Sequence, residues 1–572
     1  MWGRMKPALL IRTLVCVVIL FGAAFAHASD IRVLFDSGGE RPHNAELIQS
    51  LENQGLFSAT KRIQRAKPHA ALSQPGKLAA GDAIRLDLFE TTLDAVVEQA
   101  SVNRLGTISI RGRLEDFPKG YFSISTTRSK SLAIVRIPEK NQQYKIVYNP
   151  LTKAHYMAEM DPAGVDILDG GPPLLPEKGR KTSRSPLSAG VNTQGNAPDD
   201  EDVTITIMVV YTSAAKDWAD DSGGGIENVI SEAMALTQLV LDNSKTHTQL
   251  ELVYAGEVTD SETGSSRDIL RDLTEAGNGY MDEVHDWRDN YNADLVTLFA
   301  NVGDLGGISY QLTNEAGDPE YGFSLVRVQQ AARDVNHTFA HEIGHNLGLG
   351  HHKEQNVEPG PGLFDYSAAW RWQGGGGNWY STVMAYTEGR YYADDNDSTM
   401  LPYFSNPDVY HEGRPTGHYR DGDNARTVRQ TRHVVAAYRP DGTDKPVIHN
   451  FSVESASIEP GENTILTWWV VNAENVTIET DTGTDIGAVE AAGELEISPS
   501  ESTRYTLRAV NDAGTSSQSI FVTVDTAATD EPSDDASNNL PLTRDNGGGC
   551  FINTLTNPFT TESFVGANNH SP

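Results

Sequence analysis

Residues 336–351 read NHTFAHEIGHNLGLGH, and this stretch decides the fold and the chemistry expected of the chain. His341 and His345 are four residues apart, so on a helix their imidazoles project from one face at a separation that suits a single metal ion. Glu342 follows the first histidine and can act on a water molecule at the metal without binding the metal itself. The segment therefore predicts a metal-binding helix with a carboxylate beside the metal.

A third metal ligand is expected from the turn after this helix. Gly348 can adopt the left-handed conformation that ends a helix, and the chain then turns back and brings His351 to the same ion. Three neutral imidazoles leave one coordination position open for water, as in catalytic zinc sites. The extended pattern His-Glu-x-x-His-x-x-Gly-x-x-His is much rarer than His-Glu-x-x-His alone, which favours a zinc site over histidines that merely decorate a helix.

Residues 381–386 read STVMAY and supply a second motif at a plausible distance. With the histidines, this motif resembles the metzincin clan of zinc metalloproteases, and most nearly its reprolysin-like (adamalysin-like) branch. The resemblance covers roughly residues 203–440 and implies that Met384 forms the apolar floor of the zinc site. Tyr386 departs from the usual reprolysin turn and is similar to the astacin and serralysin pattern. A role for Tyr386 at zinc or in the transition state is therefore left open.

The resemblance also implies where a substrate binds. Residues 306–310 look like the edge strand that pairs with extended substrate in these families, which makes Gly307, Ile308 and Ser309 candidate substrate-binding residues. An ordinary glycine-containing strand is equally compatible with the sequence. Residues 403–407 and 424–426 look like a segment that follows the methionine turn in bacterial members. They either shape a substrate pocket or are a packed connector.

The expected activity is that of a secreted zinc metalloendopeptidase, a hydrolase acting on protein or peptide substrates. Zinc would lower the pKa of a water molecule and polarise the peptide carbonyl, and Glu342 would serve as general base and then pass the proton to the leaving amine. The alternative is a surface adhesion or glycan-binding protein with a vestigial zinc site. An intact Glu342 beside three intact ligands argues against that alternative.

The composition fits an exported soluble protein of three to four domains. The chain has 572 residues, a formal net charge of -33 and 38% hydrophobic residues. Its pI near 4.8 excludes nucleic acid and anionic membrane surfaces as natural partners. Arg4 and Lys6 precede an apolar run that ends in Ala-His-Ala at residues 26–28, so residues 1–28 predict a signal peptide, with a membrane anchor as the alternative.

Cysteine content narrows the expected location. Removal of the signal peptide would take Cys16 with it and leave Cys550 as the single cysteine, so no internal disulfide can form. This favours a secreted bacterial protein, with cell-surface association as a further option. Cys550 lies in a Gly-Gly-Gly-Cys-Phe-Ile stretch similar to the Cys-Phe-Ile box of exported bacterial proteins. A sorting or modification role competes there with a plain free thiol.

The chain divides by pattern into further segments. Residues 29–175 contain alternating strands (84–88, 107–110, 121–124 and 144–148) and predict a β-rich prodomain of a zymogen. No cysteine occurs in residues 29–200, so a thiolate cannot restrain the zinc. Asp161 is a weak candidate for that role and otherwise part of a solvated turn. Residues 176–202 predict an exposed linker.

The remaining segments complete the expected architecture. Residues 203–440 alternate strands and helices, which predicts an α/β catalytic domain with a mostly parallel sheet. Residues 445–525 predict an immunoglobulin-like β-sandwich that could contact a cell surface or a glycan. Residues 526–572 predict a disordered tail. The acidic cluster at residues 394–397 makes calcium a second candidate metal, although a solvated turn fits its spacing better.

Overall fold

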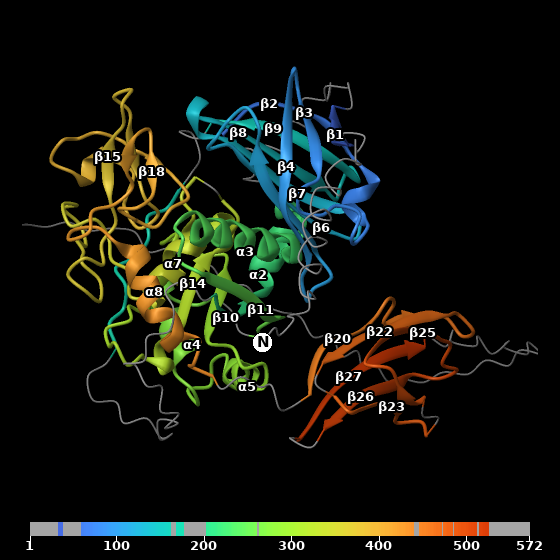
Figure 1. Ribbon diagram of the computed structural model, residues 1–572. Helices are drawn as coiled ribbons and strands as arrows, with labels where there is room; N and C mark the ends of the chain where they lie inside the picture. Colours follow the sequence, from blue (N-terminus) through green and yellow to red (C-terminus); the bar gives the residue numbers. More distant parts are fainter. Residues whose placement is uncertain are drawn as a thin grey trace, which may run out of the picture. The chain divides into compact units, whose positions relative to one another are not determined.

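The computed structural model describes residues 32–37, 59–161, 167–176, 202–259, 262–333, 335–439, 446–471, 473–483, 486–511 and 514–524. They form a closed β-barrel, an α/β unit that contains the histidine motif, and a pair of sheets nearer the carboxyl end (Figure 1). The predicted signal peptide, the tail with Cys550 and almost all of the predicted linker lie outside the described residues. Within these ranges no helix is both long and apolar enough to cross a bilayer.

The barrel is built from strands in the order β1-β2-β9-β8-β7-β6-β5-β4-β3. Neighbours are antiparallel except β1 and β3, which pair in parallel. Its strands are β1 (Arg32–Ser37), β2 (Thr60–Pro68), β3 (Ala83–Leu88), β4 (Thr91–Val102), β5 (Ile108–Leu114), β6 (Tyr121–Thr127), β7 (Lys130–Ile137), β8 (Gln142–Asn149) and β9 (Ala154–Met160), with short 3-10 helices η1 (Ala70–Ser73) and η2 (Pro138–Lys140). Every segment whose alternation predicted a strand lies in this barrel, because alternate residues fill its interior.

The α/β unit has a five-stranded sheet in the order β11-β10-β12-β14-β13. Its strands are β10 (Val203–Tyr211), β11 (Thr248–Glu257), β12 (Leu295–Ala300), β13 (Gly307–Ser309) and β14 (Phe323–Arg327). The first four in sheet order are parallel, whereas β13 pairs antiparallel with β14 at the edge. The predicted mostly parallel sheet and the edge position of residues 307–309 are confirmed.

Helices flank this sheet and position the histidine motif. They are α2 (Ser213–Trp218), α3 (Ile226–Asn243), α4 (Ser266–Thr274), α5 (Glu283–Asn290), α6 (Val328–Ala331) and α7 (Thr338–Asn346), with η4 (Ala219–Gly223) and η5 (Pro319–Tyr321). The chain leaves the helical conformation between α4 and α5, where Gly277 and Gly279 take positive φ angles of 79° and 87°. After α7 the chain forms β15 (Arg371–Gln373), β16 (Trp379–Ser381), η6 (Gly389–Tyr391), β17 (Thr399–Met400), β18 (Tyr410–His411), β19 (Arg414–Pro415) and α8 (Asn424–Val435).

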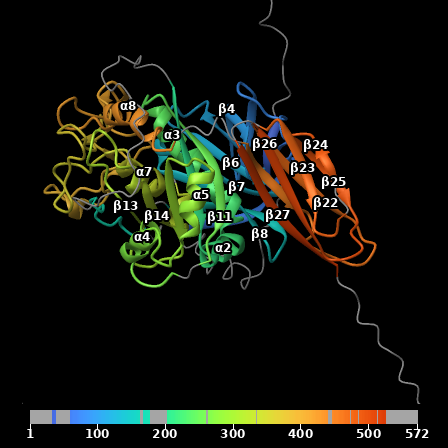
Figure 2. The ribbon, with the colours of Figure 1, turned by 90° about the horizontal axis from the view of Figure 1, so that it is seen from below.

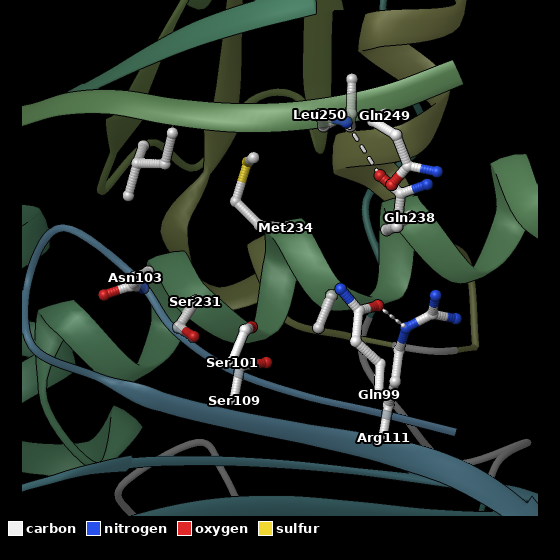
Figure 3. Close-up of a pocket in the computed structure, with 12 residues that line it drawn as sticks. Gln99, Ser101, Asn103, Ser109, Arg111, Ser231, Met234, Gln238, Gln249 and Leu250 are labelled. Carbon is white, nitrogen blue, oxygen red and sulfur yellow. Dashed lines mark hydrogen bonds between the residues drawn. The ribbon is translucent and has the colours of Figure 1, made fainter. Parts of the chain in front are cut away.

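The barrel packs directly on α3. Barrel residues Leu132 and Val147 share one apolar cluster with Val229 of α3. Ser125 of β6 donates a 3.0 Å hydrogen bond to the buried carboxylate of Glu232. A pocket of about 120 Å³ lies between β4 and β5 of the barrel and α3 and β11 of the α/β unit, with mainly polar side chains on its walls (Figure 3). The interface therefore combines an apolar patch with a polar pocket.

The segment near the carboxyl end consists of two sheets around one core. One sheet has the order β20-β22-β25 and the other the order β21-β27-β26-β23-β24 (Figure 2). The strands are β20 (Val447–Val453), β21 (Ser457–Ile458), β22 (Thr464–Val471), β23 (Asn475–Thr480), β24 (Gly487–Val489), β25 (Ala492–Ile497), β26 (Thr503–Asn511) and β27 (Gly514–Val524). Leu466 and Leu507, from opposite sheets, are both 0% exposed in this core. The immunoglobulin-like assignment stays a prediction.

Candidate metal centre and substrate cleft

Three histidines converge at the carboxyl end of α7. His341 and His345 lie one turn apart on α7, and His351 follows in the next turn of chain. The Nε2 atom of His351 lies 3.1 Å from the Nε2 atoms of both other rings. Among the described residues this is the single group of three or more His, Cys, Asp or Glu side chains arranged to hold a metal ion. The three histidines therefore converge as the sequence predicts.

The opposite ring nitrogen of each histidine faces an acceptor. Nδ1 of His341 lies 3.1 Å from the carbonyl oxygen of Val383, and Nδ1 of His351 lies 2.9 Å from that of Glu358. Nδ1 of His345 lies 3.0 Å from the amide oxygen of Gln311. Each Nδ1 therefore carries the proton and donates it, which leaves three Nε2 lone pairs pointing at one another.

This donor set fits zinc. Burial lowers the pKa of His341 to about 3 and that of His351 to about 4, and it lowers the pKa of His345 well below the usual value, so all three rings are neutral. Unprotonated nitrogens 3.1 Å apart repel unless a cation lies between them. Zinc binds imidazole nitrogen at about 2.0–2.1 Å, which places two ligand atoms of a tetrahedral ion about 3.3 Å apart.

The local sequence explains why the chain turns back after α7. Gly348 has a φ of 89°, the left-handed conformation that a side chain would disfavour. Below the helix, Met384 is fully buried, and a Cβ atom on Gly344 would lie 2.6 Å from its sulfur. Met384 thus packs tightly against the backbone between His341 and His345, which agrees with the floor position that the metzincin resemblance implies.

Glu342 is held beside the triad by the edge strand. Its Oε2 accepts a 2.7 Å hydrogen bond from the Ser309 hydroxyl, and the carboxylate is 1% exposed. A Cβ atom on Gly307 would lie 2.5 Å from Oε1, so only glycine leaves room for the carboxylate there. Burial raises the pKa of Glu342 to about 8 against the lowering effect of Ser309, and a cation at the histidines would lower it again.

A segment from the amino-terminal half of the chain lies along the open edge of β13. Gly171 donates its N–H to the carbonyl of Gly307 at 2.8 Å, and Leu174 donates to Ser309 at 2.8 Å. The segment runs parallel to β13, with a bridge between Leu174 and Tyr310. Residues 167–176 therefore add a strand-like segment at the position expected for a substrate. They lie beyond the last barrel strand, although the sequence placed them within the β-rich unit.

The centre of this segment lies beside Glu342 and Tyr386. A Cβ atom on Gly170 would lie 3.6 Å from Oε1 of Glu342. The hydroxyl of Tyr386 lies 3.3 Å from the carbonyl oxygen of Gly170 and 3.2 Å from a carboxylate oxygen of Glu358. Tyr386 also packs against the His351 ring, with ring centroids 5.1 Å apart. Tyr386 therefore reaches a peptide carbonyl that lies beside Glu342.

The other candidates have separate partners. Asp161 is half exposed and lies 3.9 Å from the ammonium group of Lys61, so its ion-pair partner belongs to the barrel. Residues 403–407 and 424–426 pack on each other: Ser405 and Asn424 are fully buried and joined by a 2.8 Å hydrogen bond. In the cluster at residues 394–397, Asp394 forms a 2.7 Å ion pair with Arg371.

Several residues of the site were not among the candidates from the sequence. Gln311 and Glu358 orient the histidines, and Gly170 lies against Glu342. Glu358 comes from a loop with no regular pattern, and Gly170 is remote in the chain from the residues it contacts. Gln311 adjoins the predicted edge strand, and an alternation count along β13 is the one signal that points its side chain toward α7.

Comparison with known proteins places the α/β unit in context. Residues 201–403 match the family described as Metallo-peptidase family M12. A peptidyl-Asp metalloendopeptidase of Xanthomonas campestris pv. campestris is 27% identical over 247 residues, which cover 43% of this chain and 54% of that protein. One from Stenotrophomonas maltophilia is 25% identical over 320 residues, 55% of this chain and 70% of that protein. The aligned region thus spans about half to two thirds of these relatives. The resemblance to reprolysin-like metalloproteases is confirmed for residues 201–403.

Solved structures add a weaker likeness. The crystal structure of metalloproteinase-II from Bacteroides fragilis superposes on 49% of this chain and 85% of its own chain. The sequence identity is 12% and the TM-score is 0.33. This TM-score is too low to support an argument about the fold.

Proposed function

Because residues 201–403 match metallo-peptidase family M12, we propose that this protein is a zinc-dependent endopeptidase whose metal is held by His341, His345 and His351. The observation that carries the proposal is the convergence of three neutral Nε2 atoms beside one buried carboxylate. A vestigial site would have little reason to keep both the ligands and the hydrogen bond that orients Glu342. The same geometry supports an enzyme over a purely adhesive protein.

Glu342 is the general base of the proposed reaction. When bound, zinc supplies the electrophile that lowers the pKa of water and polarises a peptide carbonyl. Oε2 of Glu342 is fixed by Ser309, whereas Oε1 faces the backbone of Gly170. Oε1 is therefore the atom that accepts a proton from water and returns it to the leaving amine. The Tyr386 hydroxyl is placed to donate to the carbonyl oxygen of the bond being cleaved.

The substrate binds as an added strand on β13. Gly307 and Ser309 offer main-chain carbonyl groups there, and Gly171 and Leu174 of this chain use them. The hydroxyl of Ser309 points to Glu342, so Ser309 contributes to substrate binding through its backbone. Main-chain pairing of this kind holds extended peptides of varied sequence. Cleavage beside aspartate is a natural starting point for specificity, since both relatives are named peptidyl-Asp metalloendopeptidases.

The barrel and the segment after it form an inhibitory prodomain. Residues 167–176 occupy the edge of β13 that a substrate needs, and the barrel that precedes them in the chain packs on α3. No cysteine is required, because the block is made by backbone pairing and steric cover. Export through the predicted signal peptide, followed by cleavage in the linker after residue 176, would release the enzyme outside the cell.

Metal analysis tests the proposed metal centre. Purified protein is expected to contain about one zinc per chain and to lose peptide hydrolysis on treatment with a chelator, with recovery when zinc is returned. His351→Ala removes one of the three ligands and should lower zinc content together with hydrolysis. His352→Ala is the matched control, since His352 lies next to His351 but outside the triad. Hydrolysis that survives complete removal of metal would refute the proposal.

A further inference from the structure

The residue that precedes Gly170 in the cleft is held by its side chain. Oδ2 of Asp169 lies 3.0 Å from a guanidinium nitrogen of Arg390 and accepts a hydrogen bond from the hydroxyl of Tyr391. Arg390 and Tyr391 both belong to η6, and the guanidinium carbon lies 4.7 Å from the centre of the Tyr391 ring. We name this pair of residues the η6 anchor. It holds a carboxylate one residue away from the peptide that faces Glu342.

The main chain at this position is fixed as well. The carbonyl oxygen of Asp169 accepts a 2.9 Å hydrogen bond from the N–H of Gly306, just before the edge strand. Backbone pairing on β13 therefore sets the register of the segment, and that register brings the Asp169 carboxylate to the η6 anchor. Any peptide that pairs with β13 in the same register presents one side chain to Arg390 and Tyr391.

The chemistry of the η6 anchor favours an acidic side chain. A guanidinium and a phenol hydroxyl both donate, and a carboxylate oxygen can accept from both at once, whereas an aliphatic side chain would leave both donors without this partner. Arg390 also pairs with Glu388, so it carries only part of its charge toward the cleft. The side chain of Arg390 is 61% exposed, which screens the attraction and limits the expected preference to about two- to fivefold.

We propose that Arg390 and Tyr391 form a specificity subsite for an aspartate or glutamate side chain next to the scissile bond, and that Asp169 occupies this subsite in the intact chain. The inference rests on the proposed endopeptidase function and names the residues that would set its preference. Asp169 then acts as the chain's own substitute for a substrate residue. Tyr391 is further held in place by the Tyr386 ring, with ring centroids 4.9 Å apart, which links the subsite to the catalytic cleft.

The test compares two peptides that differ only in whether one side chain is a carboxylate or its amide. Two fluorogenic peptides carry Asp or Asn beside a single cleavable bond, and kcat/KM is measured with the full zinc-loaded chain. The wild-type protein is expected to prefer the Asp peptide by about two- to fivefold. Arg390→Gln should abolish this preference while cleavage of the Asn peptide persists. Asp169→Asn should raise cleavage of both peptides, because it frees the subsite, and should keep the preference.

Arg267→Gln is the matched control. Arg267 also contacts the inhibitory segment, through the carbonyl oxygen of Pro172 at 3.3 Å, but it does not touch Asp169. This variant should retain the Asp-over-Asn preference. An unchanged preference in Arg390→Gln, or equal rates on both peptides with the wild-type protein, would overturn the subsite.

A binding measurement separates this inference from the proposed function. In the Glu342→Gln background, the affinities of the same two peptides are measured by fluorescence anisotropy for Asp169→Asn with and without Arg390→Gln. Tighter binding of the Asp peptide that depends on Arg390 supports the subsite even if no protein cleaves either peptide. Absence of cleavage even in Asp169→Asn, in which the inhibitory segment no longer fills the subsite, would count against the endopeptidase, whereas equal binding of both peptides would count against the subsite.

Discussion

The hydroxyl of Ser309 donates a 2.7 Å hydrogen bond to Oε2 of Glu342, and these side chains are 0% and 1% exposed. The bond joins the edge strand of the sheet to the helix that carries two of the three histidines. It fixes one carboxylate oxygen and leaves the other facing the cleft. The hydrogen bond therefore couples the edge strand that we propose to bind substrate to the proposed general base.

Ser309→Ala should lower kcat about ten- to a hundredfold, because Glu342 loses the donor that orients it for proton transfer. Zinc content should stay at the wild-type level, since Ser309 touches none of the histidines through its side chain. Ser324→Ala is the control: Ser324 is the neighbour of Ser309 across the β13–β14 pair, and its hydroxyl bonds to Thr297. A wild-type kcat in Ser309→Ala would show that the Ser309 hydroxyl does not orient Glu342 for catalysis.

Gly307→Ala should inactivate the enzyme. The new Cβ atom would lie 2.5 Å from Oε1 of Glu342, a distance that forces the carboxylate or the strand to move. Gly303→Ala serves for comparison, because a Cβ atom at Gly303 would meet nothing within 4 Å. Activity on a protein substrate and zinc content are measured for both. Equal activities in the two variants would show that the carboxylate does not need its present position.

Leu174→Asp should raise the activity of the full chain. Leu174 is buried against the sheet and is hydrogen-bonded through its backbone to β13, so a charged side chain there should expel the segment from the cleft. Leu175→Asp introduces the same charge one residue later, where the side chain is 66% exposed, and should leave activity unchanged. Initial rates of casein cleavage compare the two variants. If Leu174→Asp behaves like the wild-type protein, the segment is not inhibitory.

The barrel should lose stability in mild acid through His155. Burial lowers the pKa of His155 to about 4, and its Nε2 accepts a 2.9 Å hydrogen bond from the N–H of Ser131. The pKa of His155 is about 6.5 in the unfolded chain and about 4 in the folded chain, so between these pH values the unfolded chain binds the proton more strongly. The stabilising contribution is thus complete above pH 6.5 and falls by about 3 kcal/mol as the pH drops to 4.

Urea unfolding at pH 7 and pH 5 checks whether the free energy of unfolding falls in acid as predicted. His155→Gln keeps an acceptor for the Ser131 amide but does not titrate, so its loss of stability between the two pH values should be smaller than that of the wild-type protein. Equal losses of stability in both proteins would show that the acid sensitivity comes from residues other than His155.

The sequence was sufficient to predict the convergence of the three histidines because their positions depend on local structure. His341, Glu342 and His345 follow helical spacing, and Gly348 signals the turn that returns His351. The parallel strands were also readable from short apolar runs alternating with helices. In each of these cases the pattern and the structure depend on residues close together in the chain.

Long-range contacts were not readable in the same way. Asn228, Ser231 and Glu232 form the polar side of α3 and would read as solvent-facing, yet all three are buried, and the barrel partners Ser125 and Thr127 bond to Glu232 and Asn228. The segment that we propose to be inhibitory was missed for the same reason. Residues 167–176 have no periodicity, and their proposed role rests on pairing with a strand more than a hundred residues later.

Glu342→Gln tests the central claim most directly. The substitution keeps the shape of the side chain and an acceptor for Ser309 but removes the base. Zinc content and casein cleavage are measured for the wild-type and variant proteins, both as full chains and as chains that begin at residue 202. We expect about one zinc per chain in each protein and at least a thousandfold loss of cleavage in the variant. Cleavage by Glu342→Gln at the wild-type rate would contradict the account.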